Sequence, residues 1–190
     1  MSPRQTQLVS INNNHSFQTS RLSCRPINIH NRSLYQRLYC CEKVMRNISP
    51  PLSIEQANTA FERAIKLQSS HKPKLMSWTI IETSTQQAIG IQGLTWKNKY
   101  NHMEADIGFM LLPKANGKLF PEEAMGALVE YAFSYLSLTK ITAHYTKANL
   151  ATQRFVKKLG FTFPEIENEL SKAKSDIIFC YAEPEKQVTV

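Results

Sequence analysis

The segment spanning residues 103–146 constrains the fold more than any other part of the chain. Met103 to Leu112 has the pattern of a β-strand, and a polar loop that carries Gly117 follows it. A long apolar helical stripe then begins near Pro121, a residue suited to a first helical position. Lys140 to Thr146 alternates apolar and polar side chains as a second strand. Because a strand–helix–strand connection within one sheet is nearly always right-handed and parallel, the segment predicts a βαβ unit.

The residues before this unit predict helices and antiparallel strands. A short strand is expected within residues 19–28, at a sheet edge because Pro26 cannot donate to a ladder. Apolar residues at helical spacing indicate an amphipathic helix over about 31–46, and a capping box that begins at Ser53 starts a second helix. An antiparallel meander of three strands is expected to follow, from Met76 to Leu112.

The residues after the unit complete a mixed α/β pattern. Asn149 is expected to cap a helix that ends at Gly160, a residue type that favours the left-handed conformation at helix ends. A strand should open at Phe161, and residues 177–181 form the last one. We therefore expect a mixed, mostly antiparallel sheet with a central parallel βαβ unit and flanking helices.

The length and composition indicate one soluble domain. The chain has 190 residues, and we expect residues 1–18, rich in Asn and Gln, to form a flexible arm and residues 19–190 to form a single domain. The longest apolar tract, 125–138, is interrupted by Glu130, so no membrane span is predicted. The polar N-terminus also lacks the apolar core of a signal peptide. We expect a cytoplasmic protein that does not insert into membranes.

Charge and cysteine content limit the partners. Lys and Arg number 23 against 15 Asp and Glu, a net charge of +8, and the surplus is concentrated before Ser49. This favours an acidic partner such as nucleic acid, an RNA–protein particle or a phosphorylated cofactor; the alternative is a well-solvated basic surface. The 4 cysteines have no C-x-x-C spacing. We therefore expect free thiols and no metal site.

The loop over residues 113–120 is a candidate anion site. It reads Pro-Lys-Ala-Asn-Gly-Lys-Leu-Phe and joins a strand to the N-terminus of a helix. Free backbone N–H groups and the helix dipole point toward whatever binds at such a position. Lys114 and Lys118 would add charge-assisted contacts to a phosphate. The alternative is an ordinary strand–helix connection.

Four segments, in this order and spacing, resemble the GNAT superfamily of acetyl-CoA-dependent N-acetyltransferases, and within it the RimJ/RimL-like branch. They cover about residues 19–163 and read SRLSCRP, SWTIIETSTQQAIGIQGL, EADIGFMLLPKANGKLFPEEA and NLATQRFVKKLGF. The resemblance implies a GNAT-type fold. It also implies an acyltransferase that moves an acetyl group from acetyl-CoA to a primary amine.

The resemblance further implies where acetyl-CoA binds. Backbone groups near Met110 and Leu112 would pair with the pantetheine arm and polarise the thioester carbonyl, and Asn149 would reach the same arm. The loop would hold the pyrophosphate through residues that share its turn, namely Lys114, Gly117, Lys118, Leu119 and Phe120. Two features depart from the family pattern: Leu119 stands where Gly or Ala is usual, and Pro121 removes an amide donor.

Five positions bear on catalysis. Glu104 is the first candidate for the base or water-positioning group, Asp106 on the same strand face is the second, and His144 on a neighbouring strand is the third. Each has a structural alternative, as a surface carboxylate or a packed imidazole. Thr152, where the family often has Ser, would contact coenzyme A or only complete the first helical turn. Val156 stands where many members have a Tyr that reprotonates the leaving thiolate.

Three functions are compatible with these residues. The first is acetylation of a protein α-amino group, with a ribosomal protein as the type of acceptor, by a monomer or homodimer that associates with an RNA-containing particle. The second is acetylation of a small amine or antibiotic. The third is a binding module of the same fold that has lost turnover through Leu119 and Val156.

Overall fold

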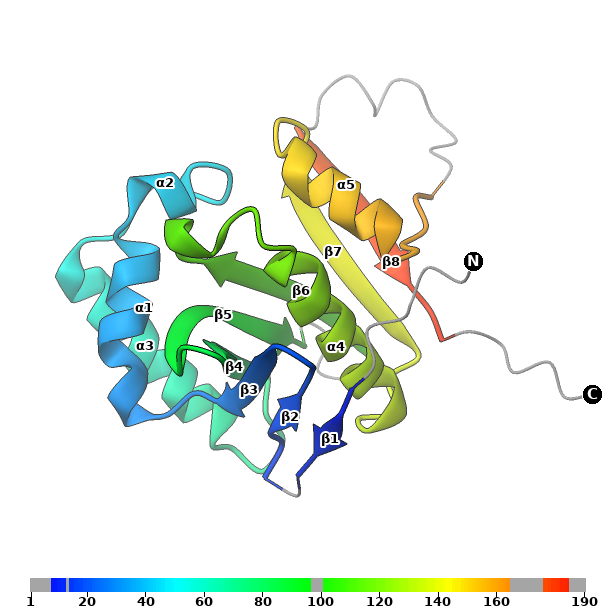
Figure 1. Cartoon of the computed structure of the whole chain (residues 1–190), viewed down its shortest axis with the longest axis horizontal. Helices are drawn as coiled ribbons and strands as arrows, with labels where there is room; N and C mark the ends of the chain where they lie inside the picture. The colour runs from blue at the N-terminus through cyan, green and yellow to red at the C-terminus, as the bar shows by residue number, and fades with distance from the viewer. Residues whose placement is uncertain (1–7, 13, 97–100, 165–175, 185–190) are drawn as a thin grey trace, which may run out of the picture.

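A single sheet of eight strands organises the chain. The computed structural model describes residues 8–12, 14–96, 101–164 and 176–184. Within them the strands follow one another in sequence order across the sheet (Figure 1). Their bounds are β1 Ser10–Ile11, β2 Phe17–Gln18, β3 Leu22–Pro26, β4 Leu75–Glu82, β5 Gln87–Thr95, β6 Glu104–Leu111, β7 Lys140–Thr146 and β8 Ile177–Ala182. All neighbouring strands are antiparallel except β6 and β7, so the expected mixed α/β fold is confirmed.

Helices cover both faces of the sheet. They are the 3₁₀ turn η1 Ile29–Asn31, α1 Arg32–Tyr39, α2 Glu42–Met45, α3 Ile54–Gln68, the 3₁₀ turn η2 Pro113–Ala115, α4 Phe120–Ser134 and α5 Leu150–Lys158. The larger apolar cluster joins the sheet to α4 and α5, and a smaller one joins it to α1 and α3. Along β6 the side chains alternate between the two clusters, as the strand period requires. None of the helices in the described residues has the length and hydropathy of a membrane span.

The predicted βαβ unit is present and opens a gap in the sheet. β6 runs into η2 and α4, and β7 returns parallel to β6. The two strands pair only where residues 104–106 lie beside residues 140–142. Beyond this point β7 stays with β8 while β6 stays with β5, so β6 and β7 diverge (Figure 1). The divergence exposes the backbone edge of β6 in the middle of the molecule.

Two expectations for the N-terminal region were wrong. The predicted arm, residues 1–18, includes strands β1 and β2, and Phe17 is fully buried with its ring stacked 4.8 Å from that of Tyr131. One aromatic side chain anchors a hairpin too short to give a periodic signal. Since β2 pairs with β3, the strand that contains Pro26 is internal and not at an edge. The single domain over residues 19–190 stays a prediction, because 165–175 and 185–190 lie outside the described residues.

Two expected elements differ in extent. The helix predicted over about 31–46 is broken, because Cys41 adopts an extended conformation between α1 and α2. The strand expected at Phe161 is reduced to one isolated bridge between Thr162 and Tyr181. In contrast, the capping box at Ser53 and the left-handed Gly160 are both confirmed.

Candidate active site

The loop before α4 leaves a row of backbone donors without acceptors. The N–H of Asn116 bonds to the carbonyl of Pro113 at 3.2 Å, and the next backbone N–H with a partner is that of Glu123, which donates to Leu119 at 3.3 Å. Between them, the N–H groups of residues 117–120 donate no hydrogen bond within the described parts of the chain. Residue 121 is proline and has no N–H. The start of α4 therefore presents neighbouring N–H groups, the arrangement that binds anions.

Two left-handed residues give this loop its shape. Gly117 has φ 79°, and Leu119, the residue before α4, has φ 60° and ψ 15°. A Cβ built on Gly117 would meet nothing within 4 Å, so the space beside this residue is open. The side chain of Leu119 is 56% exposed, so it is not packed into the protein. The conformation at Leu119 is one that L-residues rarely adopt, which explains why glycine is usual there.

Both lysines of the loop are tied to the hairpin between β4 and β5. The Nζ of Lys118 lies 3.3 Å from Oε1 of Glu82, and the Nζ of Lys114 donates to Oε1 of Gln87. A hydrogen bond from Thr85, together with the Lys118 ammonium, holds the pKa of Glu82 below its ordinary value. These tethers keep two cations beside the unpaired N–H groups.

The backbone of β6 faces the gap through different residues from those expected. The N–H of Leu112 donates to the carbonyl of Ile89 at 2.8 Å, so this group points toward β5. Because backbone direction alternates along an antiparallel pair, Met110 also faces β5. The prediction that Met110 and Leu112 present their backbone groups was therefore wrong by one residue. The N–H of Ile107 belongs to the last rung of the β6–β7 ladder, while the backbone groups of Phe109 and Leu111 point into the gap beside β7.

A carboxylate and an imidazole meet where the pairing of β6 and β7 ends. The hydroxyl of Thr142 donates to Oδ1 of Asp106, and Nδ1 of His144 lies 3.8 Å from the same oxygen. The side chain of Asp106 is 18% exposed and that of His144 is 40% exposed. Glu104, the first candidate base, lies two residues earlier on the same strand face and is exposed. It makes no hydrogen bond or ion pair to the described residues.

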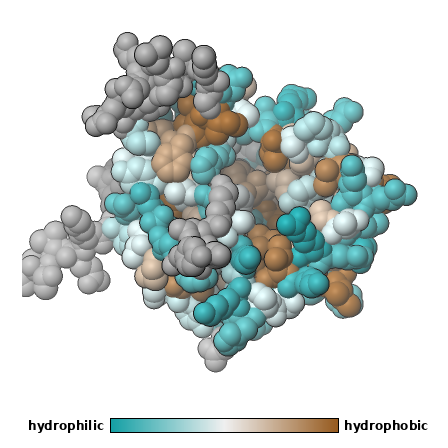
Figure 2. All heavy atoms as spheres, turned by 180° about the vertical axis from the view of Figure 1, so that it is seen from behind, coloured by the Kyte–Doolittle hydropathy of each residue, from teal (hydrophilic) through white to brown (hydrophobic). Residues whose placement is uncertain are grey.

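The sheet face around this pair is open and partly aromatic. The rings of His144 and Phe179 lie 5.1 Å apart, and the ammonium of Lys140 lies 4.4 Å from the ring centroid of Tyr181. Ile177 and Phe179 are exposed by 52% and 37%. The view from behind shows apolar side chains exposed among hydrophilic ones on this side of the molecule (Figure 2). β7 and β8 thus offer apolar contacts next to the Asp106–His144 pair.

Helix α5 closes the other side of the gap. Asn149 caps it as predicted, because its Oδ1 accepts from the N–H of Thr152 at 3.1 Å. Phe155 lies 5.0 Å from Phe109 of β6 with their rings nearly perpendicular, so the helix and the strand touch across the divergence. Val156, which stands where many members of the resembling family have a Tyr, is fully buried. Helix α5 therefore adjoins the gap through Phe155, while its core side is apolar.

Comparisons with known proteins agree with this geometry. A family profile described as the acetyltransferase (GNAT) domain matches residues 21–162. The uncharacterized N-acetyltransferase p20 of Bacillus licheniformis is 26% identical over 168 residues, which is 87% of this chain and 93% of that protein.

Solved structures show the same fold. The spermidine N-acetyltransferase of Vibrio cholerae, in complex with CoA and spermine, has a TM-score of 0.71 at 19% identity and covers 86% of this chain and 96% of its own. The ribosomal-protein-S5-alanine acetyltransferase of Vibrio fischeri has a TM-score of 0.71 at 16% identity, covering 90% and 97%. The chain therefore belongs to the acetyltransferase (GNAT) domain family and is an acetyl-CoA-dependent N-acetyltransferase.

Proposed function

We propose that this enzyme acetylates the α-amino group of a protein, with a ribosomal protein as the type of acceptor, and that it belongs to the RimJ/RimL-like branch. One observation carries the proposal. The gap between β6 and β7 leads from the unpaired N–H groups of residues 117–120, along the free backbone edge of β6, to the Asp106–His144 pair. A phosphate site, a backbone track and a proton acceptor thus follow one another.

The residues of the loop fit a coenzyme diphosphate. Four consecutive N–H groups without acceptors suit phosphate oxygens, and Gly117 leaves room for a close approach. Lys114 and Lys118 would exchange part of their contacts with the hairpin for contacts with the phosphates. Acetyl-CoA supplies the activated acetyl thioester. The N–H of Phe109, aimed into the gap, would polarise its carbonyl as an oxyanion-hole donor.

His144 and Asp106 are suited to remove the proton from the acceptor amine. With Nδ1 of His144 facing Asp106, Nε2 is the ring nitrogen that remains for the amine proton. The carboxylate of Asp106 would stabilise the imidazolium that forms, and Thr142 fixes that carboxylate in place. An α-amino group has a pKa of about 7.7–8.0 against about 10.4 for lysine. It therefore loses its proton to a weak base more readily.

The charges on the sheet face that carries Asp106 and His144 favour an acceptor with a single positive charge. On β6 and β7, which border the gap, and on the adjacent β8, the carboxylates are Glu104 and Asp106, both on β6. Lys140 adds a positive charge, and Phe179 adds an exposed ring. A polyamine, with several cations in a row, finds few partners here. A peptide N-terminus with one charge and apolar neighbours fits better.

The fold relatives act on both kinds of acceptor, so the assay must include both. The Vibrio fischeri neighbour is named for a ribosomal protein and the Vibrio cholerae neighbour for spermidine. We would measure thiol release from acetyl-CoA with a panel of N-terminal peptides, spermidine and spermine. We expect release with peptides and little with polyamines. Turnover of polyamines alone would overturn the acceptor assignment.

The base can be identified by two matched substitutions. We expect His144→Gln to lower kcat by about a hundredfold or more, the usual contribution of a general base, and to leave the Kd for acetyl-CoA unchanged. Glu104→Gln should have a smaller effect, because the exposed Glu104 side chain has no hydrogen-bond or ion-pair partner among the described residues that would position it. If Glu104→Gln abolishes turnover while His144→Gln does not, the base is Glu104 and the assignment to His144 is wrong.

A further inference from the structure

We infer that Arg21 and Glu123 form a clamp that fixes the loop of residues 117–120 in the shape that binds the coenzyme diphosphate. The inference rests on the proposed coenzyme site. Neither residue was predicted from the sequence to take part in function. Arg21 lies just before β3 and Glu123 in the first turn of α4, 102 positions apart in the chain. Both act on the ligand through the loop and are therefore positioning residues.

One arm of the clamp is a dense set of hydrogen bonds to the carboxylate of Glu123. Its Oε2 accepts from Nε and Nη2 of Arg21 at 2.6 and 2.5 Å. Its Oε1 accepts from the hydroxyl of Thr19 at 2.5 Å and from the backbone N–H of Arg21 at 3.1 Å. The side chain of Glu123 is only 11% exposed. The guanidinium is thereby held in one orientation.

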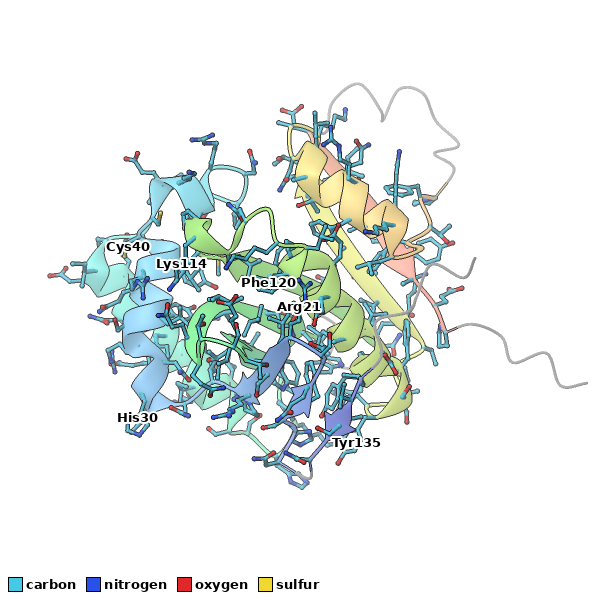
Figure 3. The ribbon with its side chains drawn as sticks, viewed as in Figure 1. Arg21, His30, Cys40, Lys114, Phe120 and Tyr135 are labelled. Carbon is cyan, nitrogen blue, oxygen red and sulfur yellow. The ribbon has the colours of Figure 1, made fainter. Side chains whose placement is uncertain are left out.

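The other arm reaches the loop itself. Nη1 of Arg21 donates to the carbonyl oxygen of Lys118 at 3.0 Å, and its guanidinium lies 4.9 Å from the ring centroid of Phe120. Figure 3 shows Arg21 beside Phe120 at the start of α4. Arg21 thus touches both residues that flank Leu119, which is left-handed and provides no side-chain cap. The guanidinium supplies the restraint that a capping side chain would otherwise give.

The contact with the Lys118 carbonyl also sets the direction of a donor. In a planar trans peptide, the C=O of one residue and the N–H of the next point in opposite directions. Because the carbonyl of Lys118 points at Arg21, the N–H of Leu119 points away from it. Rotating this peptide would turn the carbonyl oxygen toward the ligand in place of the N–H. Arg21 therefore decides whether the loop presents a donor or an acceptor at this position.

The clamp also removes a charge conflict. Glu123 lies in the first turn of α4, where a free carboxylate would repel a diphosphate. Burial acts to raise the pKa of Glu123, but hydrogen bonds from Thr19 and Arg21 and the Arg21 charge outweigh it and hold that pKa below its ordinary value. The carboxylate is therefore ionised and neutralised by Arg21 at neutral pH. Its neighbour Glu122 pairs with Lys158 at 3.6 Å, away from the loop, and serves as a control.

The test compares Arg21→Met with Arg21→Lys, using Glu122→Gln as the matched control. We expect Arg21→Met to raise the Kd for CoA and the KM for acetyl-CoA about tenfold, with kcat changed less than twofold. Arg21→Lys should lose as much, because one ammonium cannot span the Glu123 carboxylate and the Lys118 carbonyl as the guanidinium fork does. Glu122→Gln should stay within twofold of the unchanged protein.

A second readout needs no ligand. Backbone order parameters from NMR relaxation should fall at residues 117–120 in Arg21→Met and in the milder Glu123→Gln, which also serves if Arg21→Met does not fold. The clamp is refuted if Arg21→Lys binds CoA as tightly as the unchanged protein, since charge alone would then suffice, or if the order parameters do not change. Failure of the unchanged protein to bind CoA would instead refute the proposed function. The order parameters would still test the clamp, because they are measured without ligand.

Discussion

Replacing Gly117 with alanine should destabilise the protein through backbone strain alone. A left-handed conformation costs an L-residue about 1–2 kcal/mol, and Gly117 has φ 79°. No clash adds to this cost, because the new Cβ would meet nothing within 4 Å. Alanine also lowers the conformational entropy of the unfolded chain, which raises the free energy of unfolding by about 0.4–1 kcal/mol. The net loss should be at most about 1.6 kcal/mol, or up to about 6 °C in Tm for a chain of this size.

Gly108→Ala is the matched control for this strain. A Cβ on Gly108 also meets nothing within 4 Å, but Gly108 does not have a positive φ. Its replacement should leave Tm unchanged or raise it slightly. Thermal unfolding followed by circular dichroism compares the two variants. A Tm for Gly117→Ala equal to or above that of Gly108→Ala would refute the strain argument.

Gly117→Asp extends the test from stability to the ligand. Two unit charges 4 Å apart repel by about 4 kcal/mol at an effective dielectric constant of 20. A carboxylate beside the diphosphate should therefore raise the Kd for CoA by about a thousandfold, which calorimetry would register as loss of binding. Retained affinity in the folded variant would refute the assignment of the loop to the diphosphate.

Three further outcomes are expected. Phe17→Ala should lower the free energy of unfolding, measured in urea, by about 3–5 kcal/mol, because the ring is fully buried. A loss below about 1 kcal/mol would indicate that β1 and β2 are not anchored by Phe17 and behave as a flexible arm. Glu123→Gln should lower the free energy of unfolding by its full amount at pH values above about 4.3, the pKa of Glu in the unfolded chain. This difference should vanish as the pH falls through the folded-state pKa of Glu123, which lies below that value. A difference in Tm between the two proteins that stays constant down to pH 3 would contradict this. Burial raises the pKa of the Cys24 thiol, and it raises the pKa of Cys180 to about 12, so a thiol reagent at pH 8 should modify only the partly exposed Cys40 and Cys41 of the folded protein. Rapid modification of all 4 cysteines would contradict the burial of Cys24 and Cys180.

The parts of the fold with strong local signals could be predicted from the sequence. The βαβ unit is predicted by long segments of periodic hydrophobicity. The N-cap of α5 depends on the side chain of Asn149 and the turn that follows it, and the end of that helix depends on the ability of Gly160 to adopt a positive φ. Each depends on residues close together in the chain. The N-terminal hairpin does not, because its stability comes from Phe17 packing on Tyr131, far away in sequence.

The candidate loop and its lysines could be selected from the sequence because glycine and charge stand at the start of a helix, and their role stays a prediction. The phase of the β6 backbone was missed, since it depends on how β5 pairs with β6, and a shift by one residue exchanges Met110 for Phe109. The link between Arg21 and Glu123 requires the ends of β3 and α4 to meet, which no local pattern reveals.

We propose above that the main-chain N–H groups of residues 117–120 hold the coenzyme diphosphate. The most direct measurement is a titration of the ¹⁵N-labelled protein with CoA, followed through the amide resonances of this loop. We predict large shifts for Gly117, Leu119 and Phe120, as expected when a free N–H gains a charged acceptor. Saturation with CoA that leaves these three resonances unmoved would contradict the account.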